Sequence, residues 1–396
     1  MTKPFLPNGW HLVKFGRLAE SITERVDDPK AAGVNIYVGL EHLDSDTTKI
    51  SRFGTPEDIE ASKLRFYPGD VIYARRRAYQ RKLGVAEVEG ICSAHALVLR
   101  ARPDVCVPEF LPYFLQSDQF HERALSISVG SLSPTINWKT LVAQQFVLPP
   151  IAEQHRIVSL VSAIDNAISK HEFAVKKCEE AITATSVEFL ETSTVDKKKL
   201  NKVANIERGV SYKSSDYATP DKGRPFLTLK AVTRDGQFSP SGIKWVRSEF
   251  ATENSARPGD LFFANTDLTP GRLLVGAPFF FPGIKENEDP CFSMDLSRVR
   301  AVDSRVTNEY LYFVLNLPRI RKEMRRLTGG STVGHLRLRE VAEIEVPVLD
   351  EATRDHFLTL SRKLVEFQSG HFRHIHLAKE LRRNLVERCL GGVSDV

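Results

Sequence analysis

The chain of 396 residues has few cysteines and no long hydrophobic run. Its five cysteines are scattered and form no Cys-x-x-Cys pair, which argues against a disulfide framework and against a clustered zinc site. No window approaches the roughly 18 uncharged apolar residues that a membrane span needs. Pro4 and Pro7 lie where a signal peptide would have its apolar segment. We therefore expect a soluble cytoplasmic protein.

Motifs of common enzymes are also missing. The sequence contains no Gly-x-x-x-x-Gly-Lys-Ser/Thr phosphate loop, and no Gly-x-Gly-x-x-Gly follows a candidate strand. It has no Asn/Asp-Pro-Pro-Tyr/Phe, the motif that amino-methyltransferases place beside the target base. Pro103-Asp104 and Pro220-Asp221 lack the downstream Glu-x-Lys of a nuclease. These absences favour a binding protein over an enzyme. A methyltransferase or nuclease with an unrecognised motif is the alternative, and activity of the isolated chain would favour it.

Two long segments without proline predict long helices. The first, from Glu153 to Leu190, carries apolar residues at three- or four-residue intervals, which indicates an amphipathic helix. At about 1.5 Å per residue it would be roughly 57 Å long. It follows Pro149-Pro150, and prolines are tolerated at a helix start because its first N–H groups have no partner within the helix. The second segment runs from Glu351 to Leu390 and is interrupted by Gly370. Each apolar stripe needs a partner, so we expect the two helices to pack together.

The segments that precede the two helices resemble one another at a spacing near 200 residues. Pro68-Gly69-Asp70 and Pro258-Gly259-Asp260 each predict a type II turn before an apolar strand. Gly130-Ser131 and Gly330-Ser331 lie 200 positions apart. A repeat of this length indicates a duplicated domain rather than a solenoid unit. We predict an α+β fold with two globular domains in tandem, each followed by a long helix, with boundaries at 1–148, 149–192, 193–347 and 348–396.

A dense basic run follows the first Pro-Gly-Asp strand. No acidic residue lies between Val71 and Ala86, and the formal net charge of the chain is +5. Arginines beside aromatic rings suit the neutralisation of phosphates and the reading of guanine edges. A solvated strand edge is the other interpretation, but three consecutive arginines without acidic neighbours favour nucleic-acid contact. The candidate residues are Arg75, Arg76, Arg77, Tyr79, Arg81 and Lys82.

A loop rich in glycine and hydroxyl residues occurs in both halves. Small side chains let the backbone approach a phosphate or a groove edge closely. Flanking arginines can bind phosphates and so fix the position of the protein along the DNA. Either loop could instead be a plain turn. The candidates in the first half are Ser131, Ser133, Thr135, Asn137 and Lys139. Those in the second half are Arg272, Arg325, Arg326, Ser331, Thr332, His335 and Arg337.

Three histidines near the C-terminus raise the question of a metal site. On a helix His371 and His374 share a face, whereas His376 does not. Cys389 follows later, but no second ligand pair appears at a usual spacing. We therefore predict no metal site.

In this order, the features resemble the specificity subunits of type I restriction-modification systems. The most specific piece is Leu148-Pro149-Pro150-Ile151-Ala152-Glu153-Gln154-His155-Arg156-Ile157, which leads into the first long helix. Tyr37-Val38-Gly39-Leu40-Glu41-His42-Leu43, the two Pro-Gly-Asp strands and the long repeat support it. The resemblance covers essentially the whole chain. It implies two target-recognition domains that each read one half of a bipartite asymmetric DNA site, and an antiparallel helix pair that sets the distance between the halves.

The resemblance also implies partners. Members of the family dock two methyltransferase subunits, which bind S-adenosylmethionine and methylate adenine, and two restriction subunits, which use ATP and magnesium. The chain itself would be non-catalytic and would hold no cofactor. We expect partner contacts at the start of the first long helix, at Pro149, Pro150, Glu153, Gln154 and Arg156. The alternatives are a specificity subunit of a related defence system with other partner enzymes and a coiled-coil scaffold that binds DNA without reading sequence.

Overall fold

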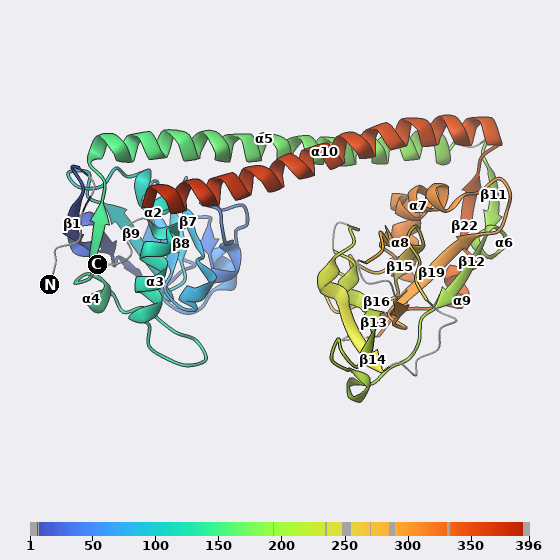
Figure 1. Ribbon diagram of the computed structural model, residues 1–396, viewed down its shortest axis with the longest axis horizontal. Coiled ribbons are helices and arrows are strands. Elements are labelled where there is room, and N and C mark those ends of the chain that lie inside the picture. The colour runs from blue at the N-terminus through green and yellow to red at the C-terminus, as the bar shows by residue number, and fades with distance from the viewer. Residues whose placement is uncertain are drawn as a thin grey trace. The chain divides into compact units, whose positions relative to one another are not determined.

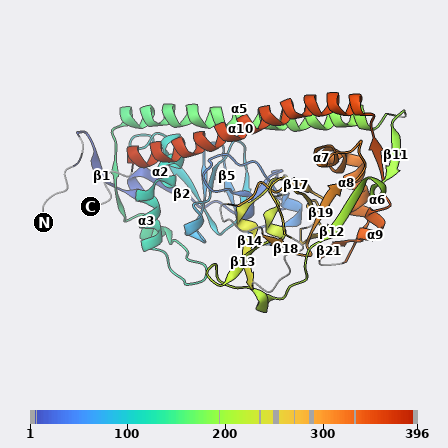
Figure 2. The same ribbon diagram turned by 45° about the vertical axis from the view of Figure 1, so that its right-hand side comes forward.

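The structure is a computed structural model that describes residues 6, 8–192, 194–233, 236–247, 255–269, 271–284, 290–330 and 333–390. The chain divides into two compact units, Met1–Glu172 with Phe372–Val396 and Phe173–His371. Helices α5 (Ile151–Leu190) and α10 (Glu351–Leu390) each contribute one half to each unit (Figures 1 and 2). The boundaries predicted from the sequence instead give each helix a segment of its own.

The first unit is built on two sheets with a shared core. One sheet has the strand order β2-β9-β6-β7 and the other β3-β5-β8-β4. All four residues of β6 are buried, with Val71 and Tyr73 in the core that includes α2 and α3, and Ile72 and Ala74 in the core that includes β4 and β5. Successive side chains of a strand point to opposite faces, so β6 is apolar on both sides. The bounds are β2 (Ala19–Ile22), β3 (Arg25–Val26), β4 (Tyr37–Val38), β5 (Lys63–Phe66), β6 (Val71–Ala74), β7 (Leu83–Val85), β8 (Gly90–Cys92) and β9 (Ala96–Ala101).

Short helices and a two-stranded ribbon complete this unit. The ribbon pairs β1 with β10 antiparallel, and β10 leads directly into α5. The bounds are β1 (His11–Lys14), α1 (Phe15–Leu18), η1 (Leu40–His42), η2 (Pro56–Asp58), η3 (Ala78–Gln80), α2 (Phe110–Gln116), α3 (Asp118–Ser126), α4 (Trp138–Leu141) and β10 (Gln145–Leu148).

The second unit repeats this order of elements. Its main sheet runs β12-β19-β15-β17, and a ribbon of β11 and β22 leads into α10 as β1 and β10 lead into α5. Further sheets run β14-β13-β18 and β16-β21-β20. The strand bounds are β11 (Asp196–Lys199), β12 (Ala204–Arg208), β13 (Gly223–Leu227), β14 (Ile243–Arg247), β15 (Leu261–Ala264), β16 (Thr266–Asp267), β17 (Pro278–Phe280), β18 (Cys291–Phe292), β19 (Leu296–Ala301), β20 (Thr328–Gly329), β21 (Gly334–Leu336) and β22 (Glu345–Val348). The helices are α6 (Leu200–Val203), η4 (Ser214–Asp216), η5 (Leu229–Ala231), η6 (Pro240–Gly242), α7 (Asn308–Asn316), α8 (Pro318–Arg326) and α9 (Leu338–Val341). The predicted tandem α+β fold is confirmed.

The Pro-Gly-Asp turns owe their form to backbone conformation and to the aspartate. Gly69 and Gly259 have φ of +89° and +86°, which a residue with a side chain rarely adopts. The Asp70 carboxylate accepts the Tyr67 N–H at 2.8 Å and two hydrogen bonds from the Arg100 guanidinium at 2.8 and 3.0 Å. The turn is thereby joined to β9, the neighbouring strand of the sheet. This explains why aspartate occupies the third position of the motif.

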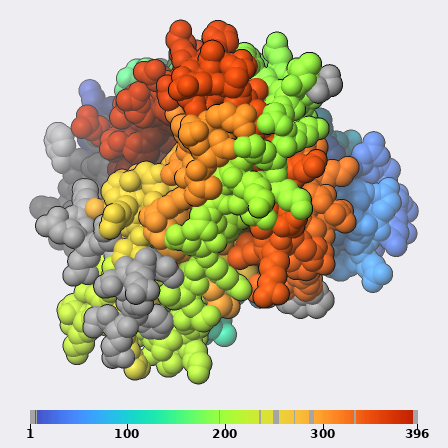
Figure 3. Space-filling view, turned by 90° about the vertical axis from the view of Figure 1, so that its right-hand side faces the viewer, coloured from blue at the N-terminus to red at the C-terminus, as the bar shows by residue number. Residues whose placement is uncertain are grey.

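Within each unit the two long helices run antiparallel and contact one another. In the first unit Asp165 and Glu172 of α5 form ion pairs with Arg382 and Lys379 of α10, at 2.6 and 3.3 Å. In the second unit the ends of α5 and α10 lie together, with the rings of Phe189 and Phe357 5.5 Å apart (Figures 1 and 3). The predicted pairing of the helices is confirmed, and α10 continues through Gly370. No helix in the described ranges is long and apolar enough for a membrane span.

Candidate nucleic-acid interface

The two segments of the first unit with candidate nucleic-acid contacts lie side by side. The chain leaving β6 forms an antiparallel bridge between Arg76 and Thr135. The Arg77 N–H donates to the Pro134 carbonyl at 2.8 Å. These backbone contacts join the basic run to the loop of serines and glycine. Residues that are far apart in the sequence thus form one surface, which we call the first recognition surface (residues 75–82 and 129–139).

Arg76 and Arg77 are the exposed arginines of this surface. Among the described residues, neither guanidinium has a hydrogen bond or an ion pair with another residue. The other cations of the run are held by the protein. Arg75 donates to the Ala94 carbonyl at 3.1 Å, and Arg81 forms an ion pair of 2.6 Å with Asp118. Arg76 and Arg77 are therefore the cations of the run that are best placed to neutralise phosphates.

The polar residues of the loop divide into exposed and structural ones. Ser131 and Lys139 are exposed, and the Lys139 ammonium group has no ion pair in the described part of the chain. The Asn137 side chain instead accepts the Lys139 N–H at 3.0 Å and caps α4. The Thr135 hydroxyl donates to the Ser133 carbonyl at 3.0 Å and tightens the loop. Tyr79 is half-exposed, and the Lys82 ammonium donates to the Leu40 carbonyl at 3.5 Å.

The corresponding surface of the second unit is formed by β16, β21, β20 and the chain around Arg272 (residues 266–273 and 325–337, the second recognition surface). Arg272 has φ of +52°, and its guanidinium donates to the carbonyls of Thr328, at 3.0 Å, and Gly330. It therefore joins two parts of the surface.

The loop that follows β16 is anchored by Asp267. The sequence analysis did not single out this residue, because an aspartate after a strand has no distinctive pattern.

The Asp267 carboxylate accepts the N–H groups of Thr269 and Leu274 at 2.6 and 2.7 Å. Burial raises the pKa of this carboxyl group, but its hydrogen bonds outweigh burial and leave the pKa below the usual value. Arg321 lies behind the same loop and donates to the Leu273 carbonyl at 2.7 Å. Its burial lowers the pKa of the guanidinium to about 10.

The cations of the second recognition surface are largely paired. Arg326 forms two hydrogen bonds with Glu323 one turn earlier on α8, and Arg337 forms an ion pair of 2.8 Å with Glu340. Arg325 is half-buried with no ion pair in the part of the chain that is described, and His335 is exposed. Ser331 and Thr332 lie outside the described residues. This surface therefore presents less unpaired positive charge than the first.

Comparisons with known proteins agree with this architecture. The family model of the type I restriction modification DNA specificity domain matches residues 7–176. The specificity subunit of the type I restriction enzyme EcoDI from Escherichia coli is 29% identical over 163 residues, 41% of this chain and 36% of that subunit. Residues 7–176 thus resemble a type I specificity domain.

More distant relatives align over most of the chain. A putative type I specificity subunit, MjaX of Methanocaldococcus jannaschii, is 21% identical over 78% of this chain and 75% of its own. The fold matches a solved structure of a type I restriction-modification system, reported for complex assembly and conformational transition. That match has a TM-score of 0.55 and 22% identity, and covers 98% of this chain and 100% of the other. The alignment to the EcoDI subunit spans about a third of that protein.

The first turn of α5 has both buried and exposed residues. Gln154 is fully buried, and its side chain accepts the Val107 N–H at 2.8 Å and donates to the carbonyls of Val105 and Pro149 at 3.0 Å. It joins the first turn of α5 to the chain before α2, and so it has no surface to offer a partner. Pro149 is buried as well.

Glu153 and Arg156 near the start of α5 are accessible. They form a two-point ion pair with both distances at 2.7 Å, and this contact holds the pKa of the Glu153 carboxyl below its usual value. Pro150 is half-exposed beside them. The expected partner contacts stay a prediction for these three residues.

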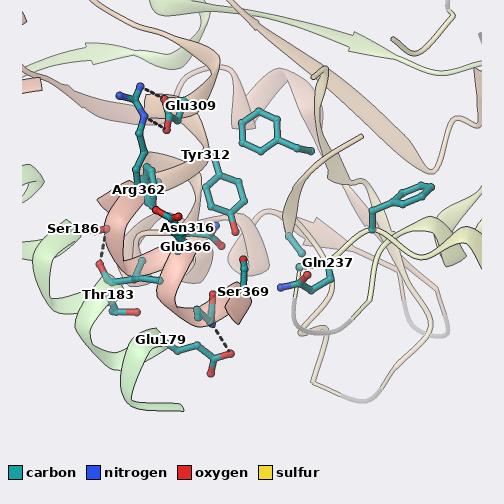
Figure 4. A pocket seen from close by; sticks show the side chains of 18 of the residues that line it. Glu179, Thr183, Ser186, Gln237, Glu309, Tyr312, Asn316, Arg362, Glu366 and Ser369 are labelled. Carbon is teal, nitrogen blue, oxygen red and sulfur yellow. Dashed lines mark hydrogen bonds and ion pairs between the residues drawn. The ribbon is translucent and has the colours of Figure 1, made fainter. Parts of the chain in front are cut away.

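Each unit also has a cavity where its globular part meets the C-terminal half of a long helix. In the second unit it has a volume of about 1080 Å³, and Glu179, Thr183, Tyr312 and Glu366 are among its lining residues (Figure 4). Arg362 and Glu309 form an ion pair at its edge (Figure 4). None of the candidate nucleic-acid contacts that fall within the described ranges lines this cavity. The cavity of the first unit has a volume of about 360 Å³ and is lined by the basic residues Arg81, Lys379, Arg382 and Arg383 along with others.

Proposed function

We propose that this chain is the DNA sequence-recognition subunit of a type I restriction-modification complex. Each globular part would read one half of a bipartite asymmetric site. The observation that carries the proposal is the pairing of a basic strand with a hydroxyl-rich loop in the first unit, with a corresponding arrangement of β16, β21 and β20 in the second. Backbone pairing holds exposed cations at fixed separations, which is what phosphate contacts need to set the register of base reading.

The long helices would fix the distance between the two half-sites. Each has 40 residues, which corresponds to about 60 Å. Half-sites on one face of DNA lie about 34 to 36 Å apart, or multiples of that. Inserting one helical turn at facing positions of both helices is expected to change the spacer length and to leave the bases of each half-site unchanged. A change in the bases with an unchanged spacer would contradict this role.

The chain would also hold the catalytic subunits together. In this proposal two methyltransferase subunits bring S-adenosylmethionine and methylate adenine, and two restriction subunits use ATP and magnesium. The chain contributes no cofactor and no catalytic group. Pro150, Glu153 and Arg156 are accessible for such contacts, and the complex would act in the cytoplasm, where its DNA is. A Glu153→Ala, Arg156→Ala double variant tests this surface by co-purification with the methyltransferase.

The decisive experiment is a single-molecule methylome of a methylation-free host that expresses this chain with its type I methyltransferase. The expected result is adenine methylation at one bipartite motif, absent when the chain is omitted. Methylation that is the same without the chain, or absent with it, would overturn the proposal. DNA binding that depends on salt but not on sequence would point to the non-specific scaffold.

A further inference from the structure

The most exposed large hydrophobic side chains of the described residues lie in the two recognition surfaces. Leu132 is 91% exposed, Val129 74% and Leu268 66%, more than any other large hydrophobic residue in the described ranges. Single apolar residues at a protein surface are common and need no explanation. Here Val129 and Leu132 lie in the hairpin of the first recognition surface, and Leu268 lies in the loop after β16, which corresponds to the basic run after β6. The three highest exposures thus belong to the two surfaces that hold the candidate nucleic-acid contacts, which points to a shared role.

The first of these loops is rigidly held. The backbones of Val129 and Thr135 exchange two hydrogen bonds of 3.0 Å, and Gly130 has φ of +108° at the turn. The loop is also fastened to the basic strand through the bridge of Arg76 to Thr135. Leu132 therefore projects from a braced hairpin. A braced side chain loses little conformational freedom when it binds, so its contacts contribute to affinity and selectivity.

The second loop is braced by different side chains. Leu268 directly follows Asp267, whose carboxylate accepts the N–H groups of Thr269 and Leu274. Arg272 in the same loop is joined to the carbonyl of Thr328. Leu268 is thus also a projecting apolar residue on a fixed loop. Side-chain hydrogen bonds hold this loop, whereas backbone hydrogen bonds hold the loop of Leu132.

The surroundings of Leu132 identify the chemistry of its partner. Arg76 and Arg77 on the adjoining segment and Lys139 in α4, the helix that follows the loop, are exposed cations without an ion pair in the described chain. An apolar tip with a cationic rim complements a DNA groove, in which base edges are flanked by phosphates. The apolar group that a base presents in the major groove is the 5-methyl of thymine.

We propose that Leu132 and Leu268 enter the DNA major groove and contact thymine methyl groups, one in each half-site. They would then be specificity-determining residues of the two recognition surfaces. The inference rests on the proposed function. It adds apolar readout to the polar contacts expected from arginine, serine and threonine.

The test uses complexes of the full chain with its methyltransferase. The variants are Leu132→Ala and Leu268→Ala, and the control is Leu377→Ala, a leucine of α10 that is 60% exposed and lies in neither recognition surface. Each variant is compared with the unaltered chain by thermal unfolding and by the methylome. Truncation of an exposed side chain is expected to leave the unfolding temperature unchanged.

The expected result is a loss of selectivity confined to one half-site. Leu132→Ala should accept other bases at an A·T pair of one half, with about tenfold less preference for the original base pair. Leu268→Ala should do the same in the other half, and Leu377→Ala should keep the full motif. At the affected position, replacing thymine by uracil should weaken binding of the unaltered complex and have no further effect on the Leu132→Ala complex.

Several outcomes would overturn the inference. One is an unchanged motif and unchanged DNA affinity in both variants, and another is equal loss on uracil substitution with and without Leu132. Reduced recovery of the methyltransferase with an intact motif would mean that the loops dock protein instead of DNA. Failure of the proposed function is separable, because then the unaltered chain itself would yield no chain-dependent motif.

Discussion

The two units have the same order of elements but differ in the side chains that join helices to globular parts. Position 154 at the start of α5 is a buried glutamine, whereas the position 200 residues later is Arg354. Arg382 of α10 binds Asp165 and Gln116 in the first unit, and Ile182 stands at the corresponding place in α5. The two units share their backbone arrangement because the buried faces of the strands specify the register of strand pairing. At the edges of the core, equivalent contacts can be made by side chains of different types.

The cavities show the same divergence. The first unit places Lys379 and Arg383 at its cavity, and the second places Glu179 and Thr183 at the corresponding positions of the other helix. The recognition surfaces differ too. Within the described residues, Arg76 and Arg77 of the first have no ion pair, while Arg326 and Arg337 of the second are paired and Arg325 is not. A duplicated domain therefore keeps its framework while its surfaces carry different charges. Four changes test how far this comparison holds.

The largest effect is expected at the first turns of the long helices. Gln154→Ala removes three internal hydrogen bonds and leaves the buried Val107 N–H without its acceptor, which should lower the free energy of unfolding by about 3 kcal/mol. Arg354→Ala should cost only about 1 kcal/mol, because the acids that contact it, Glu351 and Asp355, remain hydrated at the surface. Urea unfolding of both variants measures the difference. Equal losses would mean that the first turns of α5 and α10 are energetically alike.

The Pro-Gly-Asp turns give the next comparison. Asp70→Ala should destabilise the chain by about 2 kcal/mol, since the Tyr67 N–H and the Arg100 guanidinium both lose a buried carboxylate. Asp260→Ala should cost less, because Glu207 also binds Arg298 and keeps that buried guanidinium paired. Thermal unfolding of the two variants in parallel tests the order, and a larger effect at Asp260 would contradict it.

The recognition surfaces should differ in their response to loss of positive charge. The double variant Arg76→Ala, Arg77→Ala is expected to weaken DNA binding about tenfold. It should also make the slope of log K against log salt concentration shallower by about two, the loss expected for two phosphate contacts. Arg326→Ala should have a smaller effect, because Glu323 already neutralises this guanidinium. Binding of the assembled complex to its site at several salt concentrations gives both quantities. Similar slopes for the two variants would show that the Arg326 to Glu323 pair opens on DNA.

The smallest change tests the middle of α10. Gly370→Ala should stabilise the chain by about 0.5 to 1 kcal/mol, because alanine has the higher helix propensity and a Cβ at this position meets nothing within 4 Å. The corresponding residue of α5, Lys170, offers the matched control, since Lys170→Ala should change stability by only a few tenths of a kcal/mol. A loss of stability in Gly370→Ala would indicate that the glycine has a structural role in the helix.

Much of the framework follows from local patterns. The three- and four-residue spacing of apolar residues predicted both long helices, and Pro-Gly-Asp predicted both turns with glycine at positive φ. The constant separation of corresponding motifs predicted the duplicated domain. These features depend on residues that are close along the chain, and the helix and turn preferences of those residues operate before any tertiary contact forms.

The solvent exposure and the pairing of the candidate side chains could not be predicted from local patterns. Gln154 and Glu153 look equally polar in the sequence, yet Gln154 is buried and Glu153 accessible. Arg76 and Arg326 both lie in basic runs, and only the structure shows that Arg326 pairs with Glu323 while Arg76 has no ion pair among the residues described. Leu132 has no pattern that predicts exposure, since isolated leucines are usually buried in a core.

The sequence by itself determined the helices, the turns and the repeat, because periodicity and turn chemistry act between residues that are close along the chain. Only the tertiary structure decided that the backbone of Arg76 forms a β-bridge with that of Thr135 and that the Gln154 side chain accepts the Val107 N–H. It also decided that Leu132 and Leu268 project from braced loops. Those contacts join residues distant in the sequence, and their existence depends on how the sheets and helices pack. The recognition surfaces are therefore a property of the folded chain rather than of any one motif.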